Sequence, residues 1–297
     1  MSNDCRDVEF ENTESGSDES ASWPEKVNLF GLDVSVVDYE KATDAIIQSA
    51  KRNQSAVVSC HAAHAIVTFS GDKQLREMAN QFQMITPDGQ PVRWAMNWLH
   101  RARLKDRVYG PELMNRVCQR ACDEQVKIFF YGGASEEVLD ALENNVRENY
   151  PGLKIVGNYS PPFRELTESE KESVLKRIDD SEAQIVFIGL GCPKQDIFAF
   201  ENRDRIRAVQ VCVGAAFDFH AGTKKMAPRW MQRTGTEWLY RLCQEPGRLW
   251  KRYLVTNSQF IWRVTKQTFL GNKKNQSSVE PQHSDRNQDL IDSKQIS

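Results

Sequence analysis

Residues 126–137 read VKIFFYGGASEE and contain the end of one structural element and the start of the next. The first six residues are mostly β-branched or aromatic, which is typical of a short strand buried on both faces. Gly132 and Gly133 end this run, and Ser135 followed by two glutamates is a helix-start pattern, with acids near the positive end of the helix dipole. The stretch therefore predicts a strand, a tight glycine turn and a helix.

The same unit recurs on both sides of this stretch. Short apolar strands alternating with amphipathic helices indicate βαβ units. We therefore expect an α/β fold, a doubly wound, mainly parallel, Rossmann-like sheet, with a basic helical C-terminal appendage. Strands are predicted at 55–60, 81–85, 126–131, 153–156, 184–188 and 208–213, after a short hairpin at 27–37. Helices are predicted at 39–52, 91–101, 111–123, 167–180 and 193–203, with two more starting near 61 and 135.

Charge is distributed unevenly along the 297 residues, although the net charge is only −2. Residues 1–26 hold eight acidic and two basic side chains, whereas residues 224–274 hold twelve Lys or Arg and two Glu. The N-terminal segment has few apolar residues, so it has too little apolar surface to form a core. The expected organisation is a disordered acidic tail at 1–25, an α/β domain at 26–236, the helical appendage at 237–272 and a disordered tail at 273–297.

The cysteines indicate a reducing compartment. The chain has seven, they are scattered, and none forms a CxxC pair. Cys118 and Cys122 lie four apart, but no His or Cys follows at zinc-site spacing, so we predict no metal site. The N-terminus has no apolar signal-peptide core, and no run of about 18 apolar residues occurs. A cytoplasmic location is expected.

Two glycine loops are candidates for binding an anion. Ligands of parallel sheets bind beyond the carboxyl ends of the strands. Gly132-Gly133 lies at such a position, and so does the loop that holds Gly189, Gly191 and Gln195. Backbone amides in glycine loops approach phosphates closely. The same glycines also suit plain tight turns, so both interpretations remain open. Neither loop matches GxGxxG or GxxxxGK[ST], which argues against a dinucleotide or P-loop site.

Polar side chains follow two other predicted strands. Asp88 lies in a Pro-Asp-Gly turn and is either a general base at the sheet edge or a turn former. Ser59 lies at the end of the strand at 55–60, and His61 and His64 follow it, where the histidines either line a site or are satisfied core residues. Arg107 precedes a helix and is either a bidentate ligand for phosphate or carboxylate, or a surface arginine.

The C-terminal segment combines aromatic and basic residues. Four of the seven tryptophans lie between 230 and 262, interleaved with Arg and Lys. This pattern is typical of a helix at an anionic lipid surface, where each basic residue contributes about 1 kcal/mol. Alternatives are a helical cap with a solvated basic face, or nucleic acid, which the short segment interrupted at Pro246 disfavours. We expect a membrane surface as partner and no nucleic acid, and a homo-oligomer remains open.

A series of motifs resembles the WecG/TagA/CpsF glycosyltransferase family from about Val27 to about Tyr253. Single motifs are short, but their order and spacing together are specific. They are SCHAAH at 59–64, PDG at 87–89, DRVYGPEL at 106–113, FFYGG at 129–133, IGLGCPKQD at 188–196, VGAAFDFHAG at 213–222, APRWMQRTGTEWLYRL at 227–242 and QEPGRLWKRY at 244–253.

The resemblance implies an inverting, metal-independent and cofactor-free sugar transfer in cell-surface polysaccharide synthesis. The donor is a UDP-sugar carrying N-acetylmannosamine or another hexose, and the acceptor is a polyprenyl-diphosphate-linked sugar. The enzyme is expected on the inner face of the cell membrane. Asp88 matches the family's proposed base, and Arg107 matches its R-V-x-G arginine. The implied substrate-binding residues are Ser59, His61, Gly132, Gly133, Gly189, Gly191, Gln195, Arg241, Arg248 and Lys251.

Several positions depart from the family pattern. His61 replaces an Asn, Asp196 replaces a Glu, and Met226 replaces an Arg. Two other classes of protein share some of the features. An NAD-dependent oxidoreductase would share the parallel sheet, but it needs GxGxxG after the first strand and an acid about 20 residues later, and neither is present. A non-catalytic membrane-binding module would share the appendage but would not need Asp88, Arg107 and Gln195 in one cleft.

Overall fold

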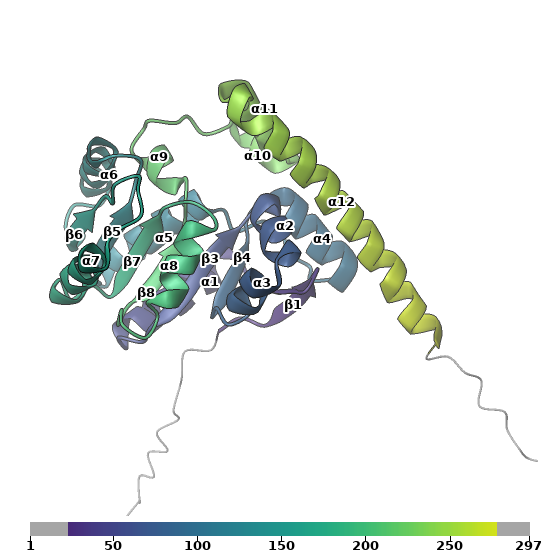
Figure 1. Cartoon of the computed structure of the whole chain (residues 1–297), viewed down its shortest axis with the longest axis horizontal. Helices are drawn as coiled ribbons and strands as arrows, with labels where there is room; N and C mark the ends of the chain where they lie inside the picture. The colour runs from purple at the N-terminus through teal and green to yellow at the C-terminus, as the bar shows by residue number, and fades with distance from the viewer. Residues whose placement is uncertain (1–22, 278–297) are drawn as a thin grey trace, which may run out of the picture.

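The computed structural model describes residues 23–277 (Figure 1), so most of the tails predicted at 1–25 and 273–297 lies outside the described residues. The strands are β1 (Lys26–Leu29), β2 (Leu32–Ser35), β3 (Ala56–His61), β4 (Met84–Pro87), β5 (Ile128–Gly132), β6 (Ile155–Tyr159), β7 (Ile185–Gly189) and β8 (Val209–Cys212). The helices of the sheet domain are α1 (Tyr39–Lys51), α2 (Ala63–Gly71), α3 (Lys73–Ala79), α4 (Gln90–His100), α5 (Gly110–Asp123), α6 (Glu136–Asn149), α7 (Glu168–Asp180), α8 (Lys194–Glu201) and α9 (Ala216–His220). They are followed by α10 (Arg229–Thr234), α11 (Glu237–Gln244) and α12 (Pro246–Ser277).

Six strands form one parallel sheet in the order β4-β3-β8-β7-β5-β6, which confirms the predicted α/β class. β1 and β2 pair separately as the antiparallel hairpin. After β3 the chain passes to β4 at one edge of the sheet, whereas after β5 it passes to β6 at the opposite edge. Such a switch in direction opens a crevice at the carboxyl ends of the strands.

The stretch at 126–137 forms the predicted elements, and its side chains explain why. Ile128 and Phe130 pack into the core on one face of the sheet, while Phe129 and Tyr131 pack into the core on the other face. A strand buried on both sides requires apolar residues at every position rather than at alternate ones. The Ser135 hydroxyl then caps α6 by accepting a hydrogen bond from the Val138 N–H at 3.4 Å.

The strand predicted at 81–85 starts three residues later in the structure and ends two residues later. β4 begins at Met84, not at Gln81, because the preceding residues close the end of α3. There the Gln81 N–H donates to the Met78 carbonyl and the Phe82 N–H to the Ala79 carbonyl. The displacement places Asp88 directly after the last residue of β4.

The helix predicted from about 61 is also two helices. Asp72 breaks it, because its carboxylate accepts a hydrogen bond from the Leu75 N–H at 3.0 Å and caps α3.

At the N-terminal boundary, Trp23 packs against the core although it falls within the predicted 1–25 tail.

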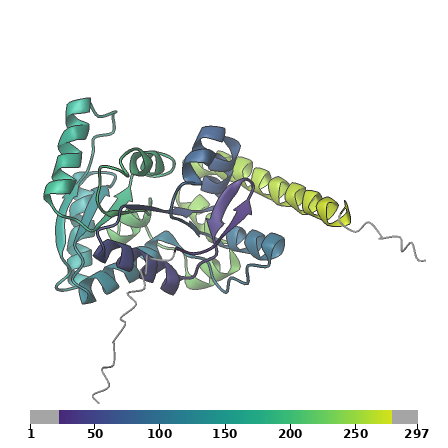
Figure 2. The ribbon, with the colours of Figure 1, turned by 90° about the horizontal axis from the view of Figure 1, so that it is seen from below.

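The appendage consists of two helices, α11 and α12, and the second begins at Pro246. α12 packs against α2 and runs to Ser277, past the boundary predicted at 272. Its Gln267 side chain accepts from the Phe30 N–H at 3.0 Å and donates to the Asn28 carbonyl at 2.9 Å. These bonds clamp α12 to the β1–β2 hairpin before the helix projects from the domain (Figure 2).

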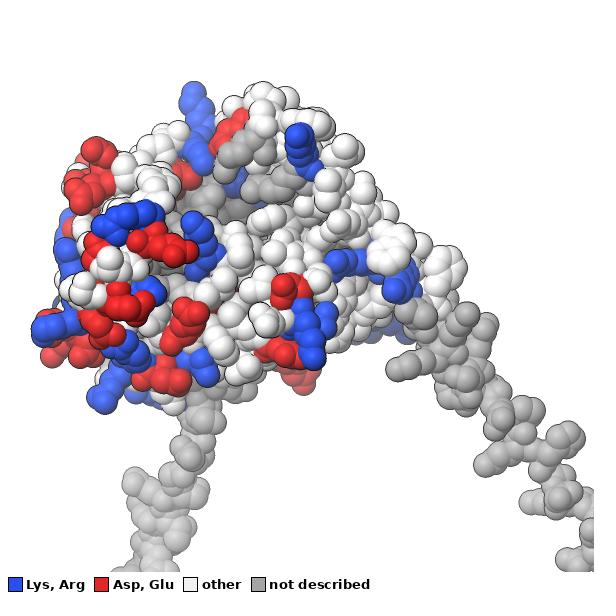
Figure 3. Space-filling model, viewed as in Figure 1, with Lys and Arg blue, Asp and Glu red and all other residues white. Residues whose placement is uncertain are grey.

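Surface charge differs between the two ends of the molecule. Around α6 and α7 acidic and basic side chains are mixed, whereas the charged side chains visible along α12 are basic (Figure 3). Residues 246–277 contain no Asp or Glu. No helix within the described range 23–277 has the length and apolar character that crossing a bilayer requires.

Candidate active site

Asp88 lies where three strand ends meet the start of α5. The Gly110 N–H, at the N-terminus of α5, donates to Asp88 Oδ2 at 3.4 Å. A Cβ atom added at Gly110 would lie 3.3 Å from the Val213 carbonyl oxygen and 3.6 Å from the Cys60 Cβ atom. The carboxyl ends of β3, β4 and β8 therefore converge on this helix terminus, whose partial positive charge favours an anion.

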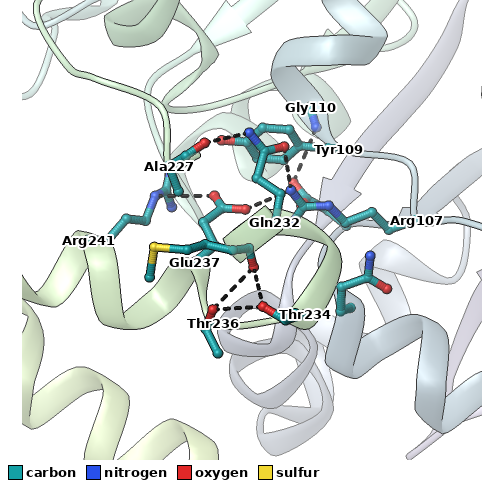
Figure 4. A network of polar contacts seen from close by, with 12 residues as sticks. Arg107, Tyr109, Gly110, Ala227, Gln232, Thr234, Thr236, Glu237 and Arg241 are labelled. Carbon is teal, nitrogen blue, oxygen red and sulfur yellow. Dashed lines mark hydrogen bonds and ion pairs between the residues drawn. The ribbon is translucent and has the colours of Figure 1, made fainter. Parts of the chain in front are cut away.

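The charges of two guanidinium groups, those of Arg107 and Arg241, act on Asp88, and both groups face Glu237 (Figure 4). Arg107 Nη2 forms an ion pair with Glu237 Oε2 at 2.6 Å and donates to Gln232 Oε1 at 3.3 Å. Its guanidinium also stacks over the Tyr109 ring, with 4.3 Å between Cζ and the ring centroid. Arg241 Nε lies 3.6 Å from the other Glu237 oxygen. Glu237 thus bridges the two arginines.

The surroundings make Asp88 a stronger base than an ordinary aspartate. Burial raises the pKa of Asp88 to about 6, against the opposing charges of Arg107 and Arg241 and the Gly110 hydrogen bond, while Glu237 raises it further. For Arg107 burial works against the charged form, but Glu237 and Asp88 outweigh it and raise its pKa. A carboxylate that takes up a proton near pH 6 suits general-base catalysis close to neutral pH.

The raised pKa of Asp88 predicts a stability effect. A group whose folded pKa exceeds its unfolded value of about 3.8 stabilises the fold below that value, and this contribution is lost as the pH rises through about 6. At pH 7.5 the ionised carboxylate therefore lowers the free energy of unfolding, by at most about 1.4 kcal/mol for each unit by which folding raises its pKa. Because Asp88 keeps some solvent contact, we expect Asp88→Asn to stabilise the protein by about 1–2 kcal/mol.

Thermal denaturation checks this expectation. The Asp88→Asn protein should melt about 2–5 °C above the wild type at pH 7.5, and the difference should shrink at pH 5. Asp140→Asn, at an exposed position of α6, is the matched control and should not move the melting temperature. A lower melting temperature for Asp88→Asn at pH 7.5 would contradict the assigned pKa.

A second polar cluster lies at the end of β3. The Ser59 hydroxyl donates to Asp196 Oδ1 at 2.5 Å, and His61 Nε2 lies 3.1 Å from the same oxygen. All three side chains are fully buried, and neither His61 Nδ1 nor Asp196 Oδ2 has a hydrogen-bond partner among residues 23–277. The cluster ties β3 to the start of α8, next to the buried side chain of Gln195.

The two clusters meet at the end of β8. A Cβ atom added at Gly214 would lie 3.4 Å from Gln195 Oε1, and the preceding Val213 carbonyl faces Gly110. Burial raises the pKa of the Cys60 thiol, and the charges of Asp88 and Asp196, one from each cluster, raise it further. The predicted residues Asp88, Arg107 and Gln195 thus lie along one edge of the sheet.

The glycines have a packing role. A Cβ atom at Gly132 would lie 2.7 Å from the Gly189 carbonyl carbon, and one at Gly189 would lie 2.6 Å from the Phe217 ring. No larger residue fits at either position. The Gly133 N–H donates to the Gly189 carbonyl at 3.2 Å, and the Gly191 N–H donates to Gln195 Oε1 at 3.2 Å. Their predicted role in substrate binding stays a prediction.

The predicted appendage residues occupy different places. Arg241 belongs to the group of charged residues around Asp88, here called the Asp88 cluster, which also contains Arg107 and Glu237. Lys251 lies over the Trp250 ring and lines a groove of about 620 Å³ between α2 and α12. No described contact joins Lys251 to Asp88. The backbone of Arg248 lies in α12, but its side chain falls outside the described residues.

Sequence reasoning missed Glu237, Gln232 and Tyr109. One signal for Glu237 was present, because Glu237 and Arg241 are four apart on a predicted helix, where opposite charges pair. Nothing in the sequence connects Glu237 with Arg107, 130 positions away. Within residues 23–277, no three His, Cys, Asp or Glu side chains group as metal ligands.

A buried carboxylate of raised pKa, acted on by the charges of two guanidiniums at the carboxyl edge of a parallel sheet, is a candidate active site of an α/β enzyme. The chain matches the model of the glycosyl transferase WecG/TagA/CpsF family over residues 27–274. It therefore belongs to that family and is a glycosyltransferase.

Proposed function

We propose that this enzyme transfers a hexose, such as N-acetylmannosamine, from a UDP donor to a polyprenyl-diphosphate-linked sugar, with inversion and without a metal ion. The observation that carries the proposal is the buried carboxylate of Asp88, which accepts from the start of α5 and is acted on by the charges of Arg107 and Arg241. The donor diphosphate lies along the glycine loops after β5 and β7. The product belongs to cell-surface polysaccharide synthesis.

In the reaction, Asp88 removes the proton from the acceptor hydroxyl. The hydroxyl oxygen attacks the anomeric carbon of the donor sugar from the face opposite the diphosphate. The new glycosidic bond forms as the bond to UDP breaks, which inverts the configuration. UDP leaves with the electron pair of the broken bond, and Arg107 and Arg241 stabilise the charge that builds on it.

The outer face of α12 supports a membrane location. Successive helix residues are about 100° apart. Leu249, Thr256 and Phe260 therefore lie on one side, buried against the domain, while Leu254 and Ile261 lie on the other, 64% and 65% exposed. We name the exposed side the apolar stripe, which consists of Trp250, Leu254, Val255, Ile261, Trp262 and Phe269.

Basic residues accompany the apolar stripe. Lys251 lies 5.4 Å from the centre of the Trp250 ring, and Lys266 lies 5.0 Å from that of Trp262. An apolar helix face with flanking cations and no acids fits an anionic bilayer surface. We propose that the enzyme binds the inner face of the cell membrane through this stripe, where its lipid-linked acceptor lies.

Nucleotide binding tests the proposed donor. Titration calorimetry of the purified protein should give a binding heat with UDP and none with NAD at the same concentration. Arg107→Gln, which keeps a hydrogen-bond donor but removes the charge, should weaken UDP binding about tenfold or more. Binding of NAD with no binding of UDP would favour an oxidoreductase and overturn the proposal.

A further inference from the structure

Glu237 is a buried carboxylate with no assigned role in the reaction. It is the first residue of α11, so it belongs to the appendage, yet its side chain is only 11% exposed and reaches the Asp88 cluster. One of its oxygens pairs with Arg107 at 2.6 Å and the other faces Arg241 at 3.6 Å. Figure 4 shows the carboxylate between the two arginines.

We propose that Glu237 is the positioning residue of this active site: it holds Arg107 and Arg241 beside Asp88 and so makes assembly of the site depend on docking of α11. The inference rests on the proposed function, in which Asp88 is the base and the arginines stabilise the leaving group. Glu237 itself contacts no reacting atom in this scheme.

The arrangement of charges supports a positioning role. Two carboxylates and two guanidiniums form a neutral group, and each guanidinium faces both acids. Arg107 has other supports, the Gln232 amide oxygen and the Tyr109 ring. Without Glu237, the two guanidiniums would share one carboxylate, Asp88, and their mutual repulsion would turn them from the orientation that the leaving group needs while both stay near Asp88.

The geometry also connects the sheet domain with the appendage. Arg107 precedes α5 in the α/β domain, whereas Glu237 and Arg241 lie on α11. The ion pair at 2.6 Å is nearly removed from water, so it fixes α11 in one position over the sheet edge. If α11 undocks, Asp88 loses Arg241 and Arg107 loses its carboxylate together.

The proposal has a consequence for pH dependence. The titratable or charged groups that face Asp88 are Tyr39 of α1, Cys60 of β3, Arg107 and Tyr109 before α5, and Glu237 and Arg241 of α11. Among these groups, Glu237 carries the negative charge that raises the pKa of Asp88. Removing that charge favours ionised Asp88, so its pKa falls, and the rate should persist to lower pH.

Glu237→Gln tests the proposal, because glutamine keeps the shape and an acceptor oxygen but not the charge. With a UDP-sugar and a short-chain lipid-linked acceptor, we expect kcat to fall about tenfold to a hundredfold, with little change in the donor KM. The acidic limb of the kcat/KM profile should move down by about half a pH unit or more. Glu143→Gln is the matched control, since Glu143 pairs with Arg147 at the same i,i+4 spacing on α6, and it should leave both quantities unchanged.

Two outcomes would overturn the proposal. One is a wild-type kcat with an unmoved acidic limb. The other is tighter donor binding with an intact kcat, which would make Glu237 a competitor of the substrate rather than a support for the arginines. If Glu237→Gln does not fold, Glu237→Asp replaces it. That variant keeps the charge, so its acidic limb should stay in place while kcat falls, and a normal kcat would contradict the positioning role.

The Asp88→Asn variant separates this proposal from the proposed function. If Asp88→Asn is inactive while Glu237→Gln behaves as the wild type, only the positioning role fails. If Asp88→Asn transfers sugar at the wild-type rate, the assignment of the base fails, whatever Glu237→Gln does.

Discussion

Replacing Asp88 with asparagine is expected to lower the rate of sugar transfer about 100- to 10,000-fold, the usual contribution of a general base. Asparagine has nearly the same shape and accepts the Gly110 hydrogen bond, but it cannot take a proton from the acceptor hydroxyl. Because Arg107 and the glycine loops remain, UDP binding should change little. Initial rates of product formation at pH 7.5, together with UDP titration calorimetry, measure both expectations.

The thermal stability of the same variant shows whether an inactive protein has lost the base or the fold. An inactive Asp88→Asn protein that melts at or above the wild-type temperature has lost the base and not the fold. Asp140→Asn on α6 should keep full activity and serves as the control. A rate for Asp88→Asn within a factor of two of the wild type would remove Asp88 from the mechanism.

Converting four residues of the apolar stripe to serine is expected to abolish vesicle binding. The residues are Trp250, Leu254, Ile261 and Trp262, each about half exposed or more. Full burial of a large apolar side chain contributes about 1.5–3 kcal/mol. Even partial insertion of four gives about 4 kcal/mol, which is about a 1000-fold change in partition. Sedimentation with vesicles that contain anionic lipid measures the loss.

Substitution is a cleaner test than truncation of the appendage. Deleting residues from about 238 onward also removes the side of α12 that buries Leu249 and Phe260 against the domain, so the rest of the protein would be destabilised. The matched control is Phe163→Ser, an aromatic residue 90% exposed in the loop before α7. Figure 1 shows α7 at the end of the domain away from α12. Phe163→Ser should bind vesicles normally. If the four-residue variant still sediments with vesicles but becomes monomeric where the wild type is dimeric, the stripe is an interface between copies of the chain.

Most of the fold could be predicted because its strands are buried on both faces. The run at 126–131 has apolar side chains that face both cores, so its pattern is unambiguous. β4 was displaced because Phe82 is as apolar as a strand residue, although its backbone closes the turn after α3. Turn hydrogen bonds of this kind do not change the hydrophobic periodicity of the sequence, so the pattern does not reveal them.

The site could be predicted only in part. The positions of Asp88 and Arg107 follow from the ends of predicted elements, and the motif series led to both. The partner of Arg107 lies 130 residues later on a different element, and only the tertiary fold brings Glu237 to it. Ser59 and His61 were predicted as substrate ligands, and this role stays a prediction; their contacts with buried Asp196 could not be predicted, because burial cannot be judged from the residue type alone.

The most direct measurement of the proposed transfer is a screen of UDP-sugars with a short-chain, lipid-linked N-acetylglucosamine acceptor. We expect one UDP-hexose to give stoichiometric UDP and a glycosylated lipid whose new bond has the opposite anomeric configuration to the donor, as determined by NMR. The Asp88→Asn protein should give neither product. Retention of configuration, or release of free sugar without glycosylated lipid for every donor, would contradict the proposed function.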